Sequence, residues 1–382
     1  MTMQRAIGRR LAVLVVMGGM AGCAVSAPDA GTVAPQAGAS TGGPCPPFGC
    51  NANSPVVDSF GFHDLLLGGP PGPASRTVPN SAGFSITALN GVAQITKAST
   101  TYDLAVTDGR FVGTRCRGSR CARLEGQGLI GATIQLARGE SQYRLEITSV
   151  RPIDYFVGTA GQVEGYTLLW STPAQKPVNL CNNITLLEQQ LAMLPGGQDG
   201  AAASEELVGM RTFEAVVFEG DEIYSDSMKF DARVDDQRFN IACAGHTLSK
   251  LLLTHNTSHS QTPGLPQALE HRQSTLKMLV ADYCGTGAGL TVAGQALVWQ
   301  GDQMTYHAQP RELEARWGPD GAQCLTAPRM LFPSTSLGAK TFPDIWGSIK
   351  AVCAAAGVPV PLPCADPDPF AYDGAFRVSA NP

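Results

Sequence analysis

Two acidic residues in the second half of the chain are candidates for acid and base chemistry. Asp282 lies in a short motif beside a cysteine, and Glu314 lies further along the chain. Two carboxylates can divide the roles of general acid and general base when their surroundings push their pKa values apart. A hydrolase that uses Asp282 and Glu314 is therefore one hypothesis, and it requires the two side chains to converge in one pocket.

A group of histidines offers a second possible site. They are His246, His255, His259 and His271. Residues four apart share a helix face, so His255 and His259 could present two imidazoles to a metal ion. The residues between and after them are rich in Asn, Ser, Thr, Pro and Gly, and no His-Glu-x-x-His core accompanies them. We therefore predict a solvated polar loop, with no metal site and no cofactor.

Other motif matches fail because of their context. Ser274-Thr275-Leu276-Lys277 matches the Ser-x-x-Lys of penicillin-recognising enzymes, but the rest of that signature is absent or in reverse order, which predicts an exposed helical turn. Gly126–Gly131 matches Gly-x-Gly-x-x-Gly, but a strand pattern follows it, which predicts a hairpin turn and no phosphate site. Gly38–Gly42 matches a nucleophile elbow but lies in a stretch too irregular to hold the strained turn.

The chain contains 11 cysteines, and all except Cys23 are candidates for disulfides. These are Cys45, Cys50, Cys116, Cys121, Cys181, Cys243, Cys284, Cys324, Cys353 and Cys364. An even set in an exported chain indicates a disulfide framework. Short spacing or a Pro-rich connection favours three local pairs, Cys45–Cys50, Cys116–Cys121 and Cys353–Cys364. The other four would form two longer bridges of open connectivity. Zinc held by the two Cys-x4-Cys pairs is the alternative, but neither pair has a second half-site in register.

The first 22 residues have the order of a secretory signal peptide. Arginines precede an apolar run, residues 11–17, and small residues follow it. The run is shorter than the ~20 apolar residues of a membrane-spanning helix. Met20-Ala21-Gly22-Cys23 resembles a lipobox, which implies that Cys23 carries a diacylglycerol and begins the mature chain. No aspartate follows Cys23, which favours the outer membrane, so we predict an exported protein held to the cell envelope by a lipid anchor.

The composition is typical of a folded extracellular protein. The chain has 43% apolar and 15% charged residues, with 43 Gly and 27 Pro and a formal net charge of −5. The net charge argues against a nucleic-acid partner and against electrostatic binding to anionic lipid. We expect a membrane contact through the lipid anchor, and an envelope protein or a glycan as a further partner.

The elements that must position these residues are mainly strands. Segments that alternate apolar and polar residues between Gly, Asn and Asp turns predict half-buried antiparallel strands. They are residues 83–89, 102–106, 132–136, 143–147, 165–170, 213–218 and 230–241. Apolar spacing of three and four predicts helices over 185–194, 247–253, 267–280 and 344–356, the last capped by Asp344. The predicted fold class is α+β: mainly antiparallel β with several short helices, stapled by disulfides.

A pair of motifs resembles a known family. Ala281-Asp282-Tyr283-Cys284-Gly285 is followed by Trp317-Gly318-Pro319-Asp320-Gly321-Ala322. Together they resemble the ADYC-domain family of exported bacterial proteins, and the likeness covers residues 105–330. The resemblance implies a fold and an extracytoplasmic address but no reaction. Similar proteins tend to carry cysteines where this chain has Leu251, after Lys250, and Ser274, so the resemblance implies that one disulfide is absent here.

These patterns divide the chain into five segments. They are a lipoprotein signal peptide (1–22), a Pro/Gly/Ala-rich tether (23–55), a β-rich lead-in (56–104), an ADYC-like domain (105–330), and a C-terminal helix with a Pro-rich tail (331–382). The tether lacks the apolar periodicity needed to bury a core.

The side chains of the motif itself favour a structural role. Cys284 is expected to be bridged, Tyr283 can bury its ring while its hydroxyl finds a partner, and Asp282 can cap the turn that Gly285 makes possible. We therefore predict a non-enzymatic binding or envelope-interaction module. The alternative is an extracytoplasmic hydrolase that uses Asp282 with Glu314, or the histidines.

Overall fold

The structure is a computed structural model, and all its described residues lie in the unit Ser40–Pro382. The described ranges are 61–69, 76–155, 161–181, 214–224, 227–244, 246–259, 268–291, 298–301, 304–305, 312–331, 344–365 and 377–381. Residues 1–22, Cys23, the tether with Cys45 and Cys50, the segment 38–42 and the expected helix 185–194 lie outside these ranges. The predictions made for them stay predictions.

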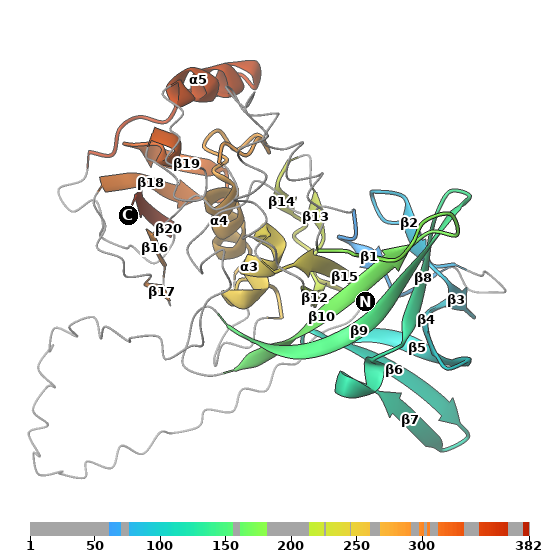
Figure 1. Ribbon diagram of the computed structural model, residues 1–382. Helices are drawn as coiled ribbons and strands as arrows, with labels where there is room; N and C mark the ends of the chain where they lie inside the picture. Colours follow the sequence, from blue (N-terminus) through green and yellow to red (C-terminus); the bar gives the residue numbers. More distant parts are fainter. Residues whose placement is uncertain are drawn as a thin grey trace, which may run out of the picture. The chain divides into compact units, whose positions relative to one another are not determined.

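Most strands of the described ranges form one antiparallel sheet of 13 strands (Figure 1). They are β1 (Leu65–Leu66), β2 (Phe84–Ile86), β3 (Ala88–Leu89), β4 (Val92–Lys97), β5 (Thr100–Thr107), β6 (Arg110–Arg117), β7 (Arg120–Leu124), β8 (Thr133–Arg138), β9 (Ser141–Asp154), β10 (Gln162–Ser171), β11 (Val178–Asn179), β12 (Ala215–Gly220) and β15 (Asp235–Cys243). Their order is β1-β15-β12-β10-β9-β8-β4-β5-β6-β7, with β2, β3 and β11 paired beside this path.

Tight glycine turns join neighbouring strands of this sheet. Asn90-Gly91 connects β3 to β4, and Asp108-Gly109 connects β5 to β6. All four residues have positive φ, between 53° and 78°. Asn-Gly and Asp-Gly favour this turn because its twist matches that of the flanking strands. The local sequence therefore specifies these hairpins.

The strands β12 and β15 separate two apolar cores. On β12, Ala215 and Val217 belong to the core that also contains Phe111 and Phe239. Val216 and Phe218 belong to a different core, which contains residues of the helices. A strand alternates its side chains between two faces, so a strand that is apolar at every position is buried on both. The apolar run Ala215–Phe218 of β12 follows from the place of this strand between the two cores.

The second core contains helices, a hairpin and a smaller sheet. The helices are α3 (Thr247–Leu253), α4 (Leu269–Val280) and α5 (Ile345–Ala355), with 3-10 turns η1 (Gly126–Leu129) and η2 (Arg329–Leu331) elsewhere in the chain. β13 (Ile223–Tyr224) pairs with β14 (Lys229–Phe230). The five-stranded sheet has the order β17-β16-β20-β18-β19 and consists of β16 (Val298–Gly301), β17 (Met304–Thr305), β18 (Glu312–Gly318), β19 (Gly321–Leu325) and β20 (Arg377–Asn381). α3 contacts β12 and β15, and α4 contacts α3 and β18.

The predicted fold class is confirmed, with corrections at particular segments. Gly126–Leu129 is a 3-10 turn that connects β7 to β8, and these strands are not paired, so the predicted hairpin is wrong. Asp344 occupies the N-cap position of α5, but its side chain makes no capping hydrogen bond. Ser274 and Lys277 are fully buried on α4, because the second core covers this helix, so the predicted exposed turn is also wrong.

Four disulfides lie within the described residues, and two of them differ from the expected pairing. The predicted Cys116–Cys121 pair forms, and Cys181 is joined to Cys243. Cys353 pairs with Cys284, and Cys364 pairs with Cys324, so the predicted local Cys353–Cys364 bridge is wrong. Cys353 has a remote partner because α5 packs against the turn that holds Cys284. Cys364 has one because the chain after α5 lies against β19, which holds Cys324.

The disulfides indicate an oxidising, extracytoplasmic environment for the folded chain. In the described ranges, none of the helices combines the length and the apolar character needed to cross a membrane.

Candidate functional site

The Ala-Asp-Tyr-Cys motif forms the turn that ends α4. Ala281 is the C-terminal cap of the helix, with a φ of 56°. The Asp282 carboxylate accepts backbone N–H groups from Thr286 (2.9 Å) and Gly287 (2.8 Å), which closes the turn. It also pairs with Lys277 at 2.6 Å, and both side chains are fully buried. The capping role predicted for Asp282 is confirmed.

The second motif packs directly on this turn. Gly285 has a φ of 68°, and a Cβ at this position would overlap the carbonyl of Asp320. The Ala322 N–H donates to the Tyr283 carbonyl at 3.1 Å. The turn between β18 and β19 therefore fits only against a glycine, because any side chain at position 285 would enter its backbone. This contact is the physical reason why the two motifs occur together in this chain.

A buried hydrogen-bond network surrounds Glu314 on β18. The Tyr283 hydroxyl and the Arg329 Nε each donate to Glu314 Oε1 at 2.6 Å. The Ser379 hydroxyl donates to Glu314 Oε2 at 2.8 Å and accepts from Trp317 Nε1 at 2.7 Å. Burial raises the pKa of Tyr283 well above its usual value, and the neighbouring Glu314 carboxylate adds to this effect. The network therefore holds Tyr283 as a neutral donor.

The two carboxylates of the hydrolase hypothesis are both inaccessible. Asp282 and Glu314 have no exposed surface, and each is held by its own cation, Lys277 and Arg329 respectively. An acid–base pair must reach a substrate and a water molecule between its two groups. The geometry of these residues supports a structural role, which satisfies the polar groups of the motif inside the core.

Lys250 on α3 is a buried amine that, unlike Lys277 and Arg329, has no carboxylate partner among the described residues. Its side chain is 1% exposed, and its Nζ has no hydrogen-bond partner among the described residues. Burial lowers the pKa of Lys250 to about 7, and the charge of nearby Arg329 acts in the same direction. A neutral amine is therefore close in free energy to the charged form at neutral pH.

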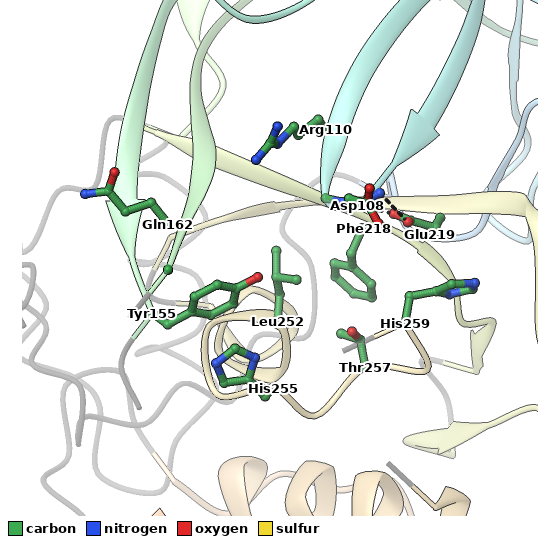
Figure 2. Close-up of a pocket in the computed structure, with 12 residues that line it drawn as sticks. Asp108, Arg110, Tyr155, Gln162, Phe218, Glu219, Leu252, His255, Thr257 and His259 are labelled. Atoms are coloured by element: carbon green, nitrogen blue, oxygen red, sulfur yellow. Dashed lines mark hydrogen bonds between the residues drawn. The ribbon is translucent and has the colours of Figure 1, made fainter. Parts of the chain in front are cut away.

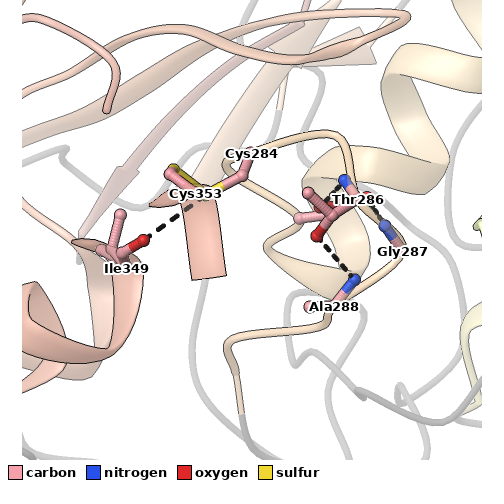
Figure 3. The surroundings of a disulfide bond; sticks show 7 residues. Cys284, Thr286, Gly287, Ala288, Ile349 and Cys353 are labelled. Atoms are coloured by element: carbon pink, nitrogen blue, oxygen red, sulfur yellow. Dashed lines mark hydrogen bonds between the residues drawn. A yellow bond between two sulfur atoms is a disulfide. The ribbon is translucent and has the colours of Figure 1, made fainter. Parts of the chain in front are cut away.

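The Cys284–Cys353 bridge joins the motif turn to α5 (Figure 3). In Figure 3, Thr286, Gly287 and Ala288 continue the turn beyond Cys284, and Ile349 precedes Cys353 on α5. The bridge, the Asp282 cap and the Gly285 contact thus fix the motif from three sides. The motif is part of the scaffold, and an accessible site must be sought elsewhere.

A cavity of about 300 Å³ lies between strands of the large sheet and the loop after α3 (Figure 2). It is lined by the turn between β5 and β6, by the end of β12, by Tyr155 after β9, and by the loop after α3. Glu219 on β12 holds the turn between β5 and β6 in place, because its carboxylate accepts the N–H groups of Asp108 (2.7 Å) and Gly109 (3.2 Å). Long-range contacts therefore build this pocket.

The pocket combines rings with charged and neutral polar groups. Tyr155 and His255 stack with ring centroids 3.9 Å apart, and in Figure 2 the Tyr155 hydroxyl points toward Leu252. Burial raises the pKa of Tyr155, which keeps its hydroxyl protonated at neutral pH. Arg110 lies on the same pocket wall as Asp108, so the positive charge has an acidic neighbour.

The segment with His255 and His259 is a loop, as predicted, but much of it is not solvated, whereas His246 is the N-cap residue of α3 and His271 lies on α4. Asn256 and Thr257 are buried beneath the pocket, at 0% and 1% exposure. Thr275 on α4 donates to Asn256 at 3.1 Å, which ties the loop to the helix. Within the described ranges, no three His, Cys, Asp or Glu side chains are grouped so as to hold a metal ion.

One arrangement in this loop was not found from the sequence. The Ser258 hydroxyl lies 3.1 Å from His259 Nδ1, and His259 Nε2 lies 3.1 Å from Asp236. Asp236 comes from β15, so only the tertiary structure brings it to the histidine. The backbone N–H of Ser258 donates to Asp221 at 2.9 Å, and Asp221 is buried and paired with Arg272 at 2.6 Å.

The family assignment follows from the motif turn together with a comparison with known families. Residues 126–331 match the model of the ADYC domain, which is more than half of the chain. The chain belongs to the ADYC-domain family. No curated protein and no solved structure matches it.

The pocket is built partly from the ADYC domain and partly from the chain before it. Tyr155, Glu219 and His259 lie within the matched residues, whereas Asp108 and Arg110 precede them. Sequence reasoning missed Tyr155 and Glu219 because nothing near them in the chain marks a site. The Asp108-Gly109 turn was the local signal available, and it predicts a hairpin but no pocket.

Proposed function

We propose that this chain is an exported lipoprotein, anchored through Cys23 to the outer membrane, whose ADYC domain binds a ligand without transforming it. The oxidising environment indicated by the disulfides and the lipobox at residues 20–23 support the location. The accessible pocket beside the buried motif carries the binding function.

The pocket chemistry suits a small, largely uncharged polar ligand such as a short envelope saccharide. A sugar offers hydroxyls that donate and accept, and Tyr155 and Gln162 can do both. Asp108 and Glu219 outnumber the single guanidinium of Arg110, and the Glu219 carboxylate already accepts two backbone N–H groups, so the pocket does not favour an anionic ligand. Rings such as that of Tyr155 supply apolar contact with a polar edge.

The experiment is calorimetric titration of the mature, oxidised chain with soluble peptidoglycan fragments and, in parallel, with N-acetylglucosamine oligomers. Tyr155→Ala removes a pocket wall, and we expect it to weaken binding at least about tenfold, the loss typical of a buried aromatic contact. Tyr224→Ala is the matched control, because Tyr224 is exposed on β13 and does not line the pocket. Equal binding by both variants would contradict the proposed site.

A second candidate function, hydrolysis, is favoured by the Ser258–His259–Asp236 arrangement. Two observations weigh against it: Ser258 is only 8% exposed, and its backbone N–H is bonded to the buried carboxylate of Asp221, which holds it away from solvent. A serine-directed fluorophosphonate probe separates the two candidates. Labelling that disappears in Ser258→Ala would favour the hydrolase, and absence of labelling would favour binding alone.

A further inference from the structure

The β6–β7 hairpin carries three arginines on one face. Arg117 is paired directly with Arg120 in the register, and Arg115 lies two residues before Arg117. Paired residues of antiparallel strands point to the same side, as do residues two apart on one strand. Arg115, Arg117 and Arg120 therefore share a face, which we call the arginine face. Arg123 lies on the opposite side, with Glu125 at 3.0 Å.

No carboxylate neutralises the arginine face within the described part of the chain. None of its arginines takes part in an ion pair there. Arg117 and Arg120 are exposed, and Arg115 is half-buried. Like charges directly opposite each other destabilise a strand pair. The stability of the hairpin therefore does not explain why these residues are arginines.

A disulfide holds the strands together where the arginines repel. Cys116 and Cys121 are bonded, and they are the pair next to Arg117 and Arg120 in the register. β7 ends the path of the large sheet, as Figure 1 shows, so no further strand pairs with it in the described ranges. At the hairpin tip, a Cβ added to Gly118 would meet nothing within 4 Å. The face is thus rigid, and its tip is open to a large partner.

We infer that the arginine face binds the phosphate groups of anionic phospholipids at a membrane surface. A guanidinium presents a planar fork of donors that matches phosphate oxygens, and it is always charged. Each arginine near an anionic surface strengthens binding about fivefold, and the rigid hairpin presents three together. The choice of a membrane as the source of phosphate rests on the proposed export and lipid anchoring of the chain.

This inference differs from the expectation drawn from net charge. The chain has a formal net charge of −5, which on average repels an anionic surface. Screening limits that repulsion to about 8–10 Å at physiological salt, so a local group of arginines can attract while distant acidic groups do not oppose it. The result would be a preferred orientation, with the hairpin turned toward the membrane.

The test is vesicle sedimentation with the mature chain carrying Cys23→Ser, so that lipid insertion cannot contribute. The vesicles consist of phosphatidylcholine with or without phosphatidylglycerol. We expect binding only to the vesicles with phosphatidylglycerol, weakened by added salt. The triple variant Arg115→Gln, Arg117→Gln, Arg120→Gln should lower partitioning roughly a hundredfold. Replacing the same three residues by Lys should retain part of the binding, because the charge remains and the fork is lost.

The control variant removes the same number of charges elsewhere. Arg76→Gln, Arg144→Gln, Arg233→Gln has the same net charge as the hairpin variant and should bind nearly as well as the parent chain. Equal losses in both triple variants, no binding of the parent chain, or hairpin-dependent binding to duplex DNA but not to vesicles would each overturn the inference. An unmodified Cys23 in cells, or unchanged saccharide binding by Tyr155→Ala, would count against the proposed function and leave the vesicle result standing.

Discussion

Lys250 shows how a single buried charge can oppose the stability of the fold. Its amine lies in the second core near the guanidinium of Arg329, and it makes no hydrogen bond in the described part of the chain. Moving an amine from water into such a site disfavours the charged form. Because the folded pKa of about 7 lies below the usual 10.5, the unfolded chain binds more protons between these two values.

We predict that replacing Lys250 by Met stabilises the protein at neutral pH. The contribution of Lys250 to the free energy of unfolding is least favourable below about pH 7 and improves as the pH rises toward 10.5. Over this window the effect is on the order of 5 kcal/mol. Denaturant unfolding at several pH values should show that Lys250→Met is most stabilising at the acidic end and loses its advantage at the alkaline end. A variant that is less stable at every pH would mean that the amine has a favourable partner in the native protein.

The carboxylates Asp282 and Glu314 illustrate the opposite situation. Asp282 accepts two backbone N–H groups and a lysine, and Glu314 accepts from Tyr283, Arg329 and Ser379. Buried polar groups of this kind specify one arrangement of the core because any alternative packing would leave them unsatisfied. They account for the presence of acidic residues in the motif without requiring a reaction.

At the scale of elements, the central contact is between the turn after α4 and the turn between β18 and β19. Gly285 permits this contact for two reasons, its positive φ and the absence of a Cβ. The two contributions can be separated, because Gly357 has almost the same φ, 69° against 68°, but open space around its missing Cβ.

We predict that Gly285→Ala destabilises the protein by about 2–4 kcal/mol, because it combines backbone strain with overlap against the Asp320 carbonyl. Gly357→Ala should cost only about 1 kcal/mol, since strain alone remains. Thermal unfolding of the two variants measures the difference. Equal destabilisation would show that the two turns can move apart at little cost.

At the scale of the whole molecule, disulfides join the matched domain to the chain that follows it. Cys284–Cys353 and Cys324–Cys364 connect residues within 126–331 to residues beyond it. β20 also pairs with β18 inside the matched range. The C-terminal segment is therefore covalently and structurally continuous with the ADYC domain.

We predict that the N-terminal peptide of the mature protein, extracted from membranes without reductant, begins at Cys23 and carries a diacylglycerol. The lipobox at residues 20–23 is the reason, because its thiol is the acceptor of the lipid. Cys23→Ser should move the protein out of the membrane fraction once the membranes are washed at high salt, which screens the contact of the arginine face with anionic lipid. Peptide mapping after alkylation should find Cys284 and Cys353 protected until reduction. An unmodified N-terminus would contradict the anchor, and a free Cys284 would contradict the described bridge.

The sequence by itself determined those features that depend on residues close together in the chain. Period-two segments became strands, Asp108-Gly109 became a hairpin turn, and Asp282 capped the turn next to it. Cys116 and Cys121 paired because a hairpin places them opposite each other. In each case the interacting groups are only a few residues apart, so local conformation is sufficient.

Only the tertiary structure decided which distant residues meet. It gave Cys353 and Cys364 remote partners although a local pair was available. It buried Lys250 and enclosed Glu314, and it brought Asp236 to His259. Strand order, register and helix packing set these contacts, and many sequences with the same periodicity are compatible with different arrangements. The pocket depends on this level because its walls come from the turn between β5 and β6, Tyr155 after β9, β12 and the loop after α3, and no local pattern records that these lie close together.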